Sequence, residues 1–208
     1  MGFKDIIDKL KSKGIVFANG LTEEEFSKVE NLYNIKFPKE LKNFLAEGLP
    51  FAEYTSYLPN AGEKEYCHYV FPFPVWNDFS EENIKKIKDW IAKPKRLLRE
   101  EYENVKNNKK EFWTFCNDLG LDFEKKVEEI NKEFDIFESN LENTIPIFGH
   151  RYMLQNDNSP ILLITKTDDI ALYGKDLQDY LECEFLDKRV DANYEKADLG
   201  NWHDVLFR

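Results

Sequence analysis

The chain has 208 residues, of which 42% are hydrophobic and 15% aromatic, and it carries a net charge of −11. This length and composition suffice for a hydrophobic core and exclude a chain that is disordered throughout. The negative charge disfavours binding to nucleic acid or to an anionic membrane surface. The longest aliphatic run, residues 161–164, is far shorter than a membrane-spanning helix. We therefore expect neither nucleic acid nor a membrane as a partner.

The first fifty residues predict three short helices. Apolar residues recur at helical spacing across residues 3–10, which indicates the first helix. Thr22 and Glu25 have the spacing of a capping box, in which each side chain bonds the backbone amide of the other residue at the start of a helix. Pro38 suits the first turn of a third helix, and Gly48 is expected to end that helix in the left-handed conformation.

The region that follows predicts a strand and then a helix with an interruption. Residues 66–71 form the best strand, and we expect it at a sheet edge because Pro72 and Pro74 cannot donate to a ladder. Ser80 can cap the next helix. That helix should break or kink at Lys93-Pro94, since proline removes a hydrogen bond and crowds the preceding turn.

The second half of the chain changes from helical to extended periodicity. Residues 122–141 carry apolar side chains at spacings of three and four, which predicts the longest helix. Short apolar runs separated by turn residues then predict an antiparallel meander. These runs cover residues 145–148, 152–154, 161–165 and 170–173. A closing helix capped by Asp176 should follow.

Together these elements predict an α+β fold in which helices pack against a largely antiparallel or mixed sheet. No repeat, linker or change in composition marks a boundary, so residues 1–208 are expected to form a single domain.

Charge is unevenly distributed along the chain. Residues 85–110 contain 10 basic and 4 acidic residues, whereas residues 121–142 contain 8 acidic and 3 basic ones. Residues 168–208 hold 11 acids and 5 bases. Surfaces of this sign would steer a basic protein partner towards the molecule.

The residue types needed for metal, cofactor and disulfide chemistry are sparse. Cys67, Cys116 and Cys183 are odd in number and widely spaced, which fits a reducing cytoplasm and no disulfide framework. The acid among the first apolar residues also disfavours a secretory signal. The three histidines lack the spacing of a metal site, and no glycine-rich phosphate loop is present. We expect no metal and no cofactor.

One pair of residues invites a catalytic interpretation. His150 and Arg151 lie between two predicted strands, where histidine could titrate near neutral pH and arginine could bind a carboxylate. With Asp169 they could serve a hydrolase. A structural role for the pair is the favoured alternative, and we predict no catalytic residue.

Two blocks of the sequence resemble the SUKH superfamily, the bacterial proteins similar to the yeast Smi/Knr cell-wall regulator. The first block runs Gly20-Leu21-Thr22-Glu23-Glu24-Glu25-Phe26, then Glu30, Ile35, Phe37-Pro38, Leu41 and Phe44-Leu45. The second runs Ile145-Pro146-Ile147-Phe148-Gly149-His150-Arg151-Tyr152, then Asn158-Ser159-Pro160-Ile161, Asp169-Ile170-Ala171-Leu172-Tyr173-Gly174 and Leu177 to Phe185.

The resemblance implies a non-enzymatic α+β module that binds a protein. Many bacterial members look like cytoplasmic immunity proteins, which bind and neutralise the toxin domain of a cognate secreted toxin. Our preferred interpretation is such a protein, acting on a basic toxin domain such as a nuclease. A cytoplasmic scaffold or regulator of the Smi/Knr type is the first alternative, and the hydrolase is the second. We expect a monomer or a weak homodimer.

Contact residues for a protein partner are sought among exposed aromatic and polar side chains near loops and sheet edges. The predicted set is Trp76, Asp78, His150, Arg151, Asp169 and Tyr173.

Overall fold

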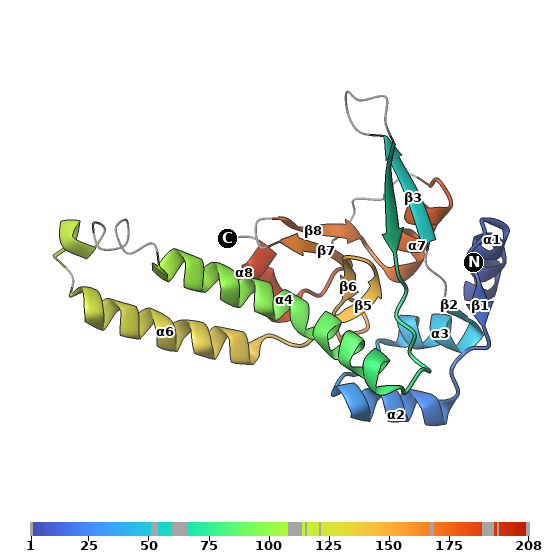
Figure 1. The fold of residues 1–208 in the computed structure, drawn as a ribbon, viewed down its shortest axis with the longest axis horizontal. Helices are drawn as coiled ribbons and strands as arrows, with labels where there is room; N and C mark the ends of the chain where they lie inside the picture. Colours follow the sequence, from blue (N-terminus) through green and yellow to red (C-terminus); the bar gives the residue numbers. More distant parts are fainter. Residues whose placement is uncertain are drawn as a thin grey trace.

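The structure is a computed structural model that describes residues 2–50, 54–59, 66–107, 114, 116–120, 122–166, 169–188, 194 and 196–206. For residues 54–59, 66–71 and 105–107 only the backbone is described. These residues form an α+β domain with antiparallel sheets, as expected from the sequence (Figure 1).

Three helices open the chain, namely α1 (Phe3–Ser12), α2 (Glu23–Tyr33) and α3 (Lys39–Glu47). The predicted capping box is present at α2. The Thr22 hydroxyl accepts from the Glu25 amide at 3.3 Å, and the Glu25 carboxylate accepts from the Thr22 amide at 2.8 Å. This bond to the Thr22 backbone amide lowers the pKa of Glu25. Short strands β1 (Phe17–Ala18) and β2 (Leu49–Pro50) pair with each other beside these helices.

Gly48 does not end α3 in the left-handed conformation, so this prediction is wrong. Its φ of −177° is extended and leads directly into β2, whereas Asn34 at the end of α2 has the left-handed φ of 50°. Gly48 is instead constrained by space. A Cβ atom there would lie 3.1 Å from Phe17 and 3.3 Å from Ile7.

The main sheet is the predicted antiparallel meander, with strand order β5-β6-β7-β8. Its strands are β5 (Ile145–Phe148), β6 (Arg151–Met153), β7 (Ile161–Lys166) and β8 (Asp169–Gly174). The register places Arg151 beside Leu163 and Leu163 beside Ala171. Thr167 and Asp168, which belong to the predicted turn between β7 and β8, lie outside the described residues.

Helix α7 (Leu177–Phe185) follows the sheet, and two acidic residues satisfy its first amides. The Asp176 side chain caps it, as predicted. The Glu40 carboxylate of α3 also accepts hydrogen bonds from the Leu177 and Gln178 amides, at 3.1 and 3.3 Å. A carboxylate is favourable at the positive end of a helix dipole. This contact ties the start of the chain to its closing helix.

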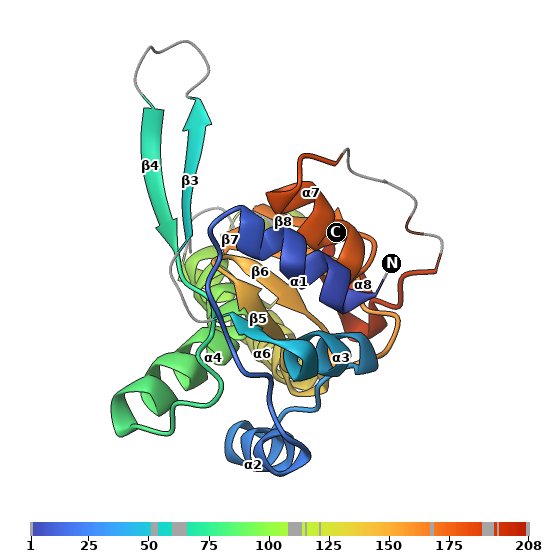
Figure 2. The same ribbon diagram turned by 90° about the vertical axis from the view of Figure 1, so that its right-hand side faces the viewer.

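Strands β3 (Tyr54–Pro59) and β4 (Tyr66–Phe71) form a two-stranded sheet of their own. Residues 66–71 therefore form the predicted edge strand, but in this separate sheet and not at the edge of the main one. Figure 2 shows the hairpin standing away from the body. After β4, the Pro72 carbonyl accepts a hydrogen bond from the Gly149 amide at 3.2 Å, which links this segment to the β5–β6 turn.

Helix α4 (Glu81–Asn107) contains Pro94 and continues through it, so of the predicted break or kink the break does not occur. Both halves of the helix are anchored in the protein. Ile87 and Ile91 are buried before the proline, and Leu98 is buried after it. Burial of such side chains contributes roughly 1.5–3 kcal/mol each, which offsets the roughly 3 kcal/mol cost of an internal proline.

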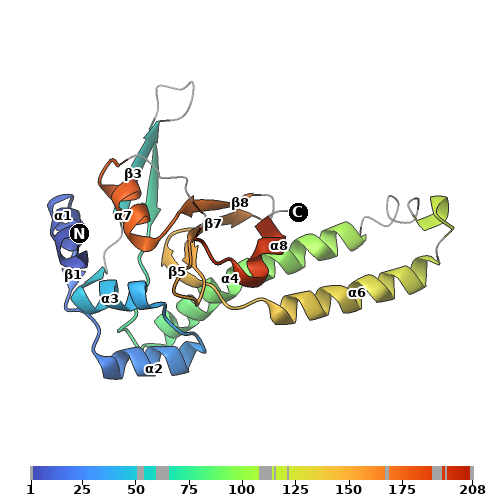
Figure 3. The same ribbon diagram turned by 180° about the vertical axis from the view of Figure 1, so that it is seen from behind.

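Helix α6 (Phe123–Asn140) runs beside the second half of α4, and the pair extends beyond the sheet (Figures 1 and 3). With 18 residues it is shorter than the 27-residue α4, which continues through Pro94, so the prediction that it is the longest helix is wrong. We call residues 95–107 of α4 together with α6 the arm. The last described elements are the short helices η1 (Gly200–Trp202) and α8 (His203–Leu206), which lie near the base of the arm.

The main sheet has a hydrophobic core on each face. One core contains Met153 and Ile161 with buried residues of α1, α2, α3 and α7. The other contains Tyr152 and Leu162 with Phe134 of the arm and the buried Trp202. Successive strand residues point to opposite faces, so neighbours in sequence enter different cores.

Candidate functional site

Trp76 is the first of the predicted partner residues, and the structure places it in the core. Its side chain is 1% exposed, and its ring makes edge contacts with Phe37 at 5.1 Å and Tyr33 at 5.9 Å. Its assignment to a contact surface is therefore wrong. An aromatic residue in a proline-rich loop was expected outside, but Tyr33 of α2 and Phe37 before α3 pack against it.

Asp78 is exposed, and the structure gives it a local role. Its carboxylate accepts a hydrogen bond from the Ser80 amide at 2.9 Å, and its carbonyl accepts one from the Asn83 side chain at 2.7 Å. These bonds shape the turn that begins α4. Asp78 remains exposed and can still reach a partner.

Arg151 and Tyr173 meet on one face of the sheet, as their alternation along β6 and β8 requires. The Arg151 guanidinium lies 3.9 Å from the centroid of the Tyr173 ring. The same guanidinium lies 3.4 Å from the carboxylate of Glu184 on α7. The side chains of Arg151 and Glu184 are only 15% and 13% exposed. Burial raises the pKa of Tyr173, and the charge of Glu184 raises it further. The cluster fastens α7 to the sheet.

His150 faces α4, and its Nδ1 atom lies 3.2 Å from Lys93 Nζ. Burial lowers the pKa of His150, and the positive charges of Lys93 and Arg151 lower it further. Asp169 begins β8 opposite Lys166 and is hydrogen-bonded to the Thr165 hydroxyl. The three side chains engage different partners, because His150 lies beside Lys93, Arg151 beside Tyr173 and Glu184, and Asp169 beside Thr165. This arrangement does not favour the hydrolase alternative.

The arm joins the basic segment of the sequence to the acidic one. Arg99 of α4 pairs with Asp135 at 3.0 Å and with Glu138, both on α6. The Tyr102 hydroxyl donates to Asn131 at 2.6 Å, and the Tyr102 ring stacks on Phe134 with centroids 4.0 Å apart. The two helices therefore brace each other through charges, a hydrogen bond and aromatic contact.

An open groove of about 330 Å³ lies between the arm and α8. This volume falls at the lower end of the roughly 300–1,000 Å³ range of small-ligand sites, so it suits one side chain or a short segment. Its wall is aromatic and apolar, with two carboxylates from different helices. The lining residues are Tyr102, Ile130, Glu133, Phe134, Phe137 and Asp204.

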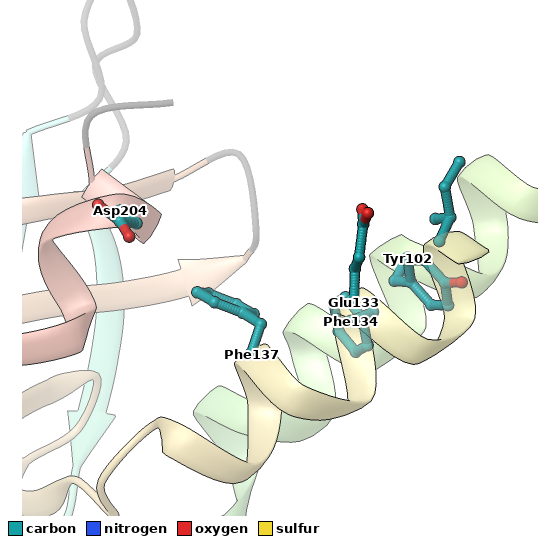
Figure 4. Close-up of a pocket in the computed structure, with 6 residues that line it drawn as sticks. Tyr102, Glu133, Phe134, Phe137 and Asp204 are labelled. Carbon is teal, nitrogen blue, oxygen red and sulfur yellow. The ribbon is translucent and has the colours of Figure 1, made fainter.

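The close-up shows how these side chains are arranged. Glu133 and Phe137 project from neighbouring turns of α6, and Phe137 points towards α8, where Asp204 lies (Figure 4). Residues four apart share one face of a helix, so Glu133 and Phe137 both line the groove from α6. We call this site the acidic aromatic groove.

The acidic aromatic groove keeps negative charge. Glu133 forms no ion pair with any residue in the described part of the chain. Nearby lysines on α6 are engaged elsewhere, since Lys126 pairs with Glu129 at 3.3 Å and Lys132 pairs with Glu128 at 2.9 Å. His203 Nδ1 lies 3.4 Å from Asp204 on the exposed surface of α8. The groove can therefore attract a cation and provide aromatic faces for it.

Sequence reasoning missed this site because it depends on three separate helices. Phe134 and Phe137 were assigned to the apolar face of the long helix, and the structure buries Phe134 but leaves Phe137 partly open. The available signal was the placement of Glu133 at helical spacing from Phe137 within an acidic helix. Tyr102 and Asp204 carried no local signal.

Metal and membrane sites were also sought. Among the described residues no group of three or more His, Cys, Asp or Glu side chains could hold a metal ion. In the same part of the chain, no helix is both long and apolar enough to cross a membrane. Comparison of the chain with models of protein families, with curated proteins and with solved structures finds no match.

Proposed function

We propose that the chain is a non-enzymatic protein-binding module that works as an immunity protein, binding a basic toxin domain and neutralising it. The observation that carries the proposal is the acidic aromatic groove, a braced surface in which the Glu133 carboxylate pairs with no basic side chain of the described residues. The SUKH-like sequence blocks motivate the choice of a toxin as the partner.

The charge distribution supports a basic partner. The chain carries 40 acidic and 29 basic residues, and Arg99 of the basic segment is already paired with acids of α6. Internal pairing of this kind leaves the surplus of acids for the surface. Complementary charge raises association rates and discriminates against wrongly charged partners.

The rigidity of the arm supports binding by a preformed surface. Stacking of Tyr102 on Phe134 and pairing of Arg99 with two carboxylates hold α4 and α6 in register before any partner arrives. A preformed surface loses less conformational entropy on binding than a mobile one. An inhibitor that must block a toxin quickly benefits from this property.

Co-expression with the product of a neighbouring toxin gene tests the proposal. We expect growth to be restored, and we expect the two purified proteins to form a complex that weakens as salt rises, because exposed charges are screened. Capture of a constitutive housekeeping protein in place of a toxin would instead favour the scaffold or regulator alternative. Failure to bind or protect against any neighbouring toxin would contradict the immunity function.

A further inference from the structure

We infer that the acidic aromatic groove receives an arginine side chain from a basic segment of the protein partner. This inference rests on the proposed protein-binding function and specifies where and how that binding takes place. The guanidinium would lie against the Phe137 ring and bridge the carboxylates of Glu133 and Asp204.

The arm already contains the same chemistry within the chain. The Arg99 guanidinium lies 4.7 Å from the centroid of the Phe134 ring while it pairs with Asp135 and Glu138. An aromatic face with flanking carboxylates on α6 thus accommodates a guanidinium. Less than one turn further along α6, Phe137 provides the next ring on the groove side.

The groove offers two carboxylates that approach from different elements. Glu133 projects from α6 and Asp204 from α8, and the Phe137 ring extends from α6 into the space between them (Figure 4). A planar guanidinium has donors directed to several sides and a flat face that stacks on aromatic rings. A lysine ammonium matches the charges but lacks the flat face. This geometry favours arginine.

Other occupants fit the groove less well. A phosphate or carboxylate group would be repelled by Glu133 and Asp204. A purely apolar side chain would cover the Glu133 carboxylate without providing a partner, and burying an unpaired charge is costly. A basic side chain both neutralises the carboxylates and uses the apolar wall.

A titration of the full chain with a hexa-arginine peptide, followed by ¹H–¹⁵N NMR at low salt, tests the inference. We expect the largest shift changes at the amides of Glu133, Phe137 and Asp204. The variant Glu133→Gln/Asp204→Asn should bind the peptide at least about tenfold more weakly, because both charge-assisted contacts are lost. Hexa-lysine should bind the unmodified chain more weakly than hexa-arginine.

A matched control separates the groove from general charge attraction. The variant Glu24→Gln/Glu47→Gln removes the same two charges from exposed positions on α2 and α3, and it should bind hexa-arginine within about twofold of the unmodified chain. Equal weakening in both variants would overturn the inference, as would equal affinity for hexa-lysine or shift changes centred outside the groove.

A failure of arginine binding in the groove can be distinguished from a failure of the proposed immunity function. If the unmodified chain protects cells from the toxin and the Glu133→Gln/Asp204→Asn variant protects equally well with unchanged affinity, the inference fails and the proposed function stands. If the unmodified chain gives no protection, the proposed function fails whatever the peptide titration shows.

Discussion

The Tyr102 ring stacks on the Phe134 ring at a centroid distance of 4.0 Å and an interplanar angle of 12°. This contact joins α4, from the basic segment of the sequence, to α6, from the acidic one. It also forms part of the wall of the acidic aromatic groove. The stability of the arm and the shape of the groove therefore depend on the same pair of side chains.

Replacing Tyr102 should loosen the arm. We expect Tyr102→Ala to lower the free energy of unfolding by about 2–3 kcal/mol, because the ring contact and its burial are lost. Tyr102→Phe retains the ring and loses only the bond to Asn131, so it should cost about 1 kcal/mol. Urea unfolding followed by circular dichroism measures both values. Equal costs for the two variants would show that the stack contributes little.

Replacing Arg151 should leave the Glu184 carboxylate of α7 without its charged partner. We expect Arg151→Met to lower the free energy of unfolding by about 3 kcal/mol, because Glu184 is left nearly buried without its partner. The double variant Arg151→Met/Glu184→Met should recover part of this loss, since it removes the unpaired charge. Thermal and urea unfolding test the pair. A double variant no more stable than Arg151→Met would contradict this account.

Stability should depend on pH through His150. Because burial, Lys93 and Arg151 lower its pKa in the folded state, the unfolded chain binds a proton at a higher pH than the folded chain does. The contribution of His150 is thus complete above the unfolded pKa of about 6.5 and declines as pH falls below it. The free energy of unfolding can be measured in urea between pH 5 and pH 8, which covers about 1.5 units on each side of that pKa. It should vary less with pH for His150→Gln than for the unmodified chain. If the free energy of unfolding changed equally with pH in both proteins, His150 would not be the source of the pH dependence.

Gly20 should tolerate no side chain. A Cβ atom there would lie 1.8 Å from the Ala46 carbonyl oxygen, and the adjacent Leu21 amide donates to the Leu45 carbonyl at 2.9 Å. Gly20→Ala must therefore displace backbone, and we expect a loss of about 3 kcal/mol or more. Gly2→Ala is the matched control, because a Cβ at Gly2 meets no atom within 4 Å. Similar unfolding free energies for the two variants would refute this explanation.

The sheet and the closing helix could be predicted because their signals are local. The apolar runs of β5 to β8 and the Asp176 cap are each encoded within a few neighbouring residues. The same is true of the Thr22–Glu25 capping box. These elements needed no knowledge of distant contacts.

The errors arose where distant contacts override a local preference. Gly48 follows a helix, yet contact with Ile7 and Phe17 explains why it is glycine. Pro94 remains within α4 because the helix is buried on either side of it. Trp76 is enclosed by residues more than thirty positions away in the chain, including Tyr33 and Phe37.

The predicted partner residues and the groove show the same limit. Arg151 and Tyr173 were both predicted as partner contacts within the strand block, but the contact with Glu184 that engages Arg151 internally depends on how α7 folds back. The acidic aromatic groove requires α4, α6 and α8 to converge. Spacing within any one of these helices does not reveal the convergence.

Tyr152 and Met153 are adjacent in β6, yet they belong to the cores on opposite faces of the main sheet. Melting of either core would withdraw support from a strand that the other core also needs. The two halves of the molecule should consequently unfold together, in one cooperative transition, despite the length of the arm. Partner binding at the arm would then stabilise the whole domain, including α1 on the far face of the sheet.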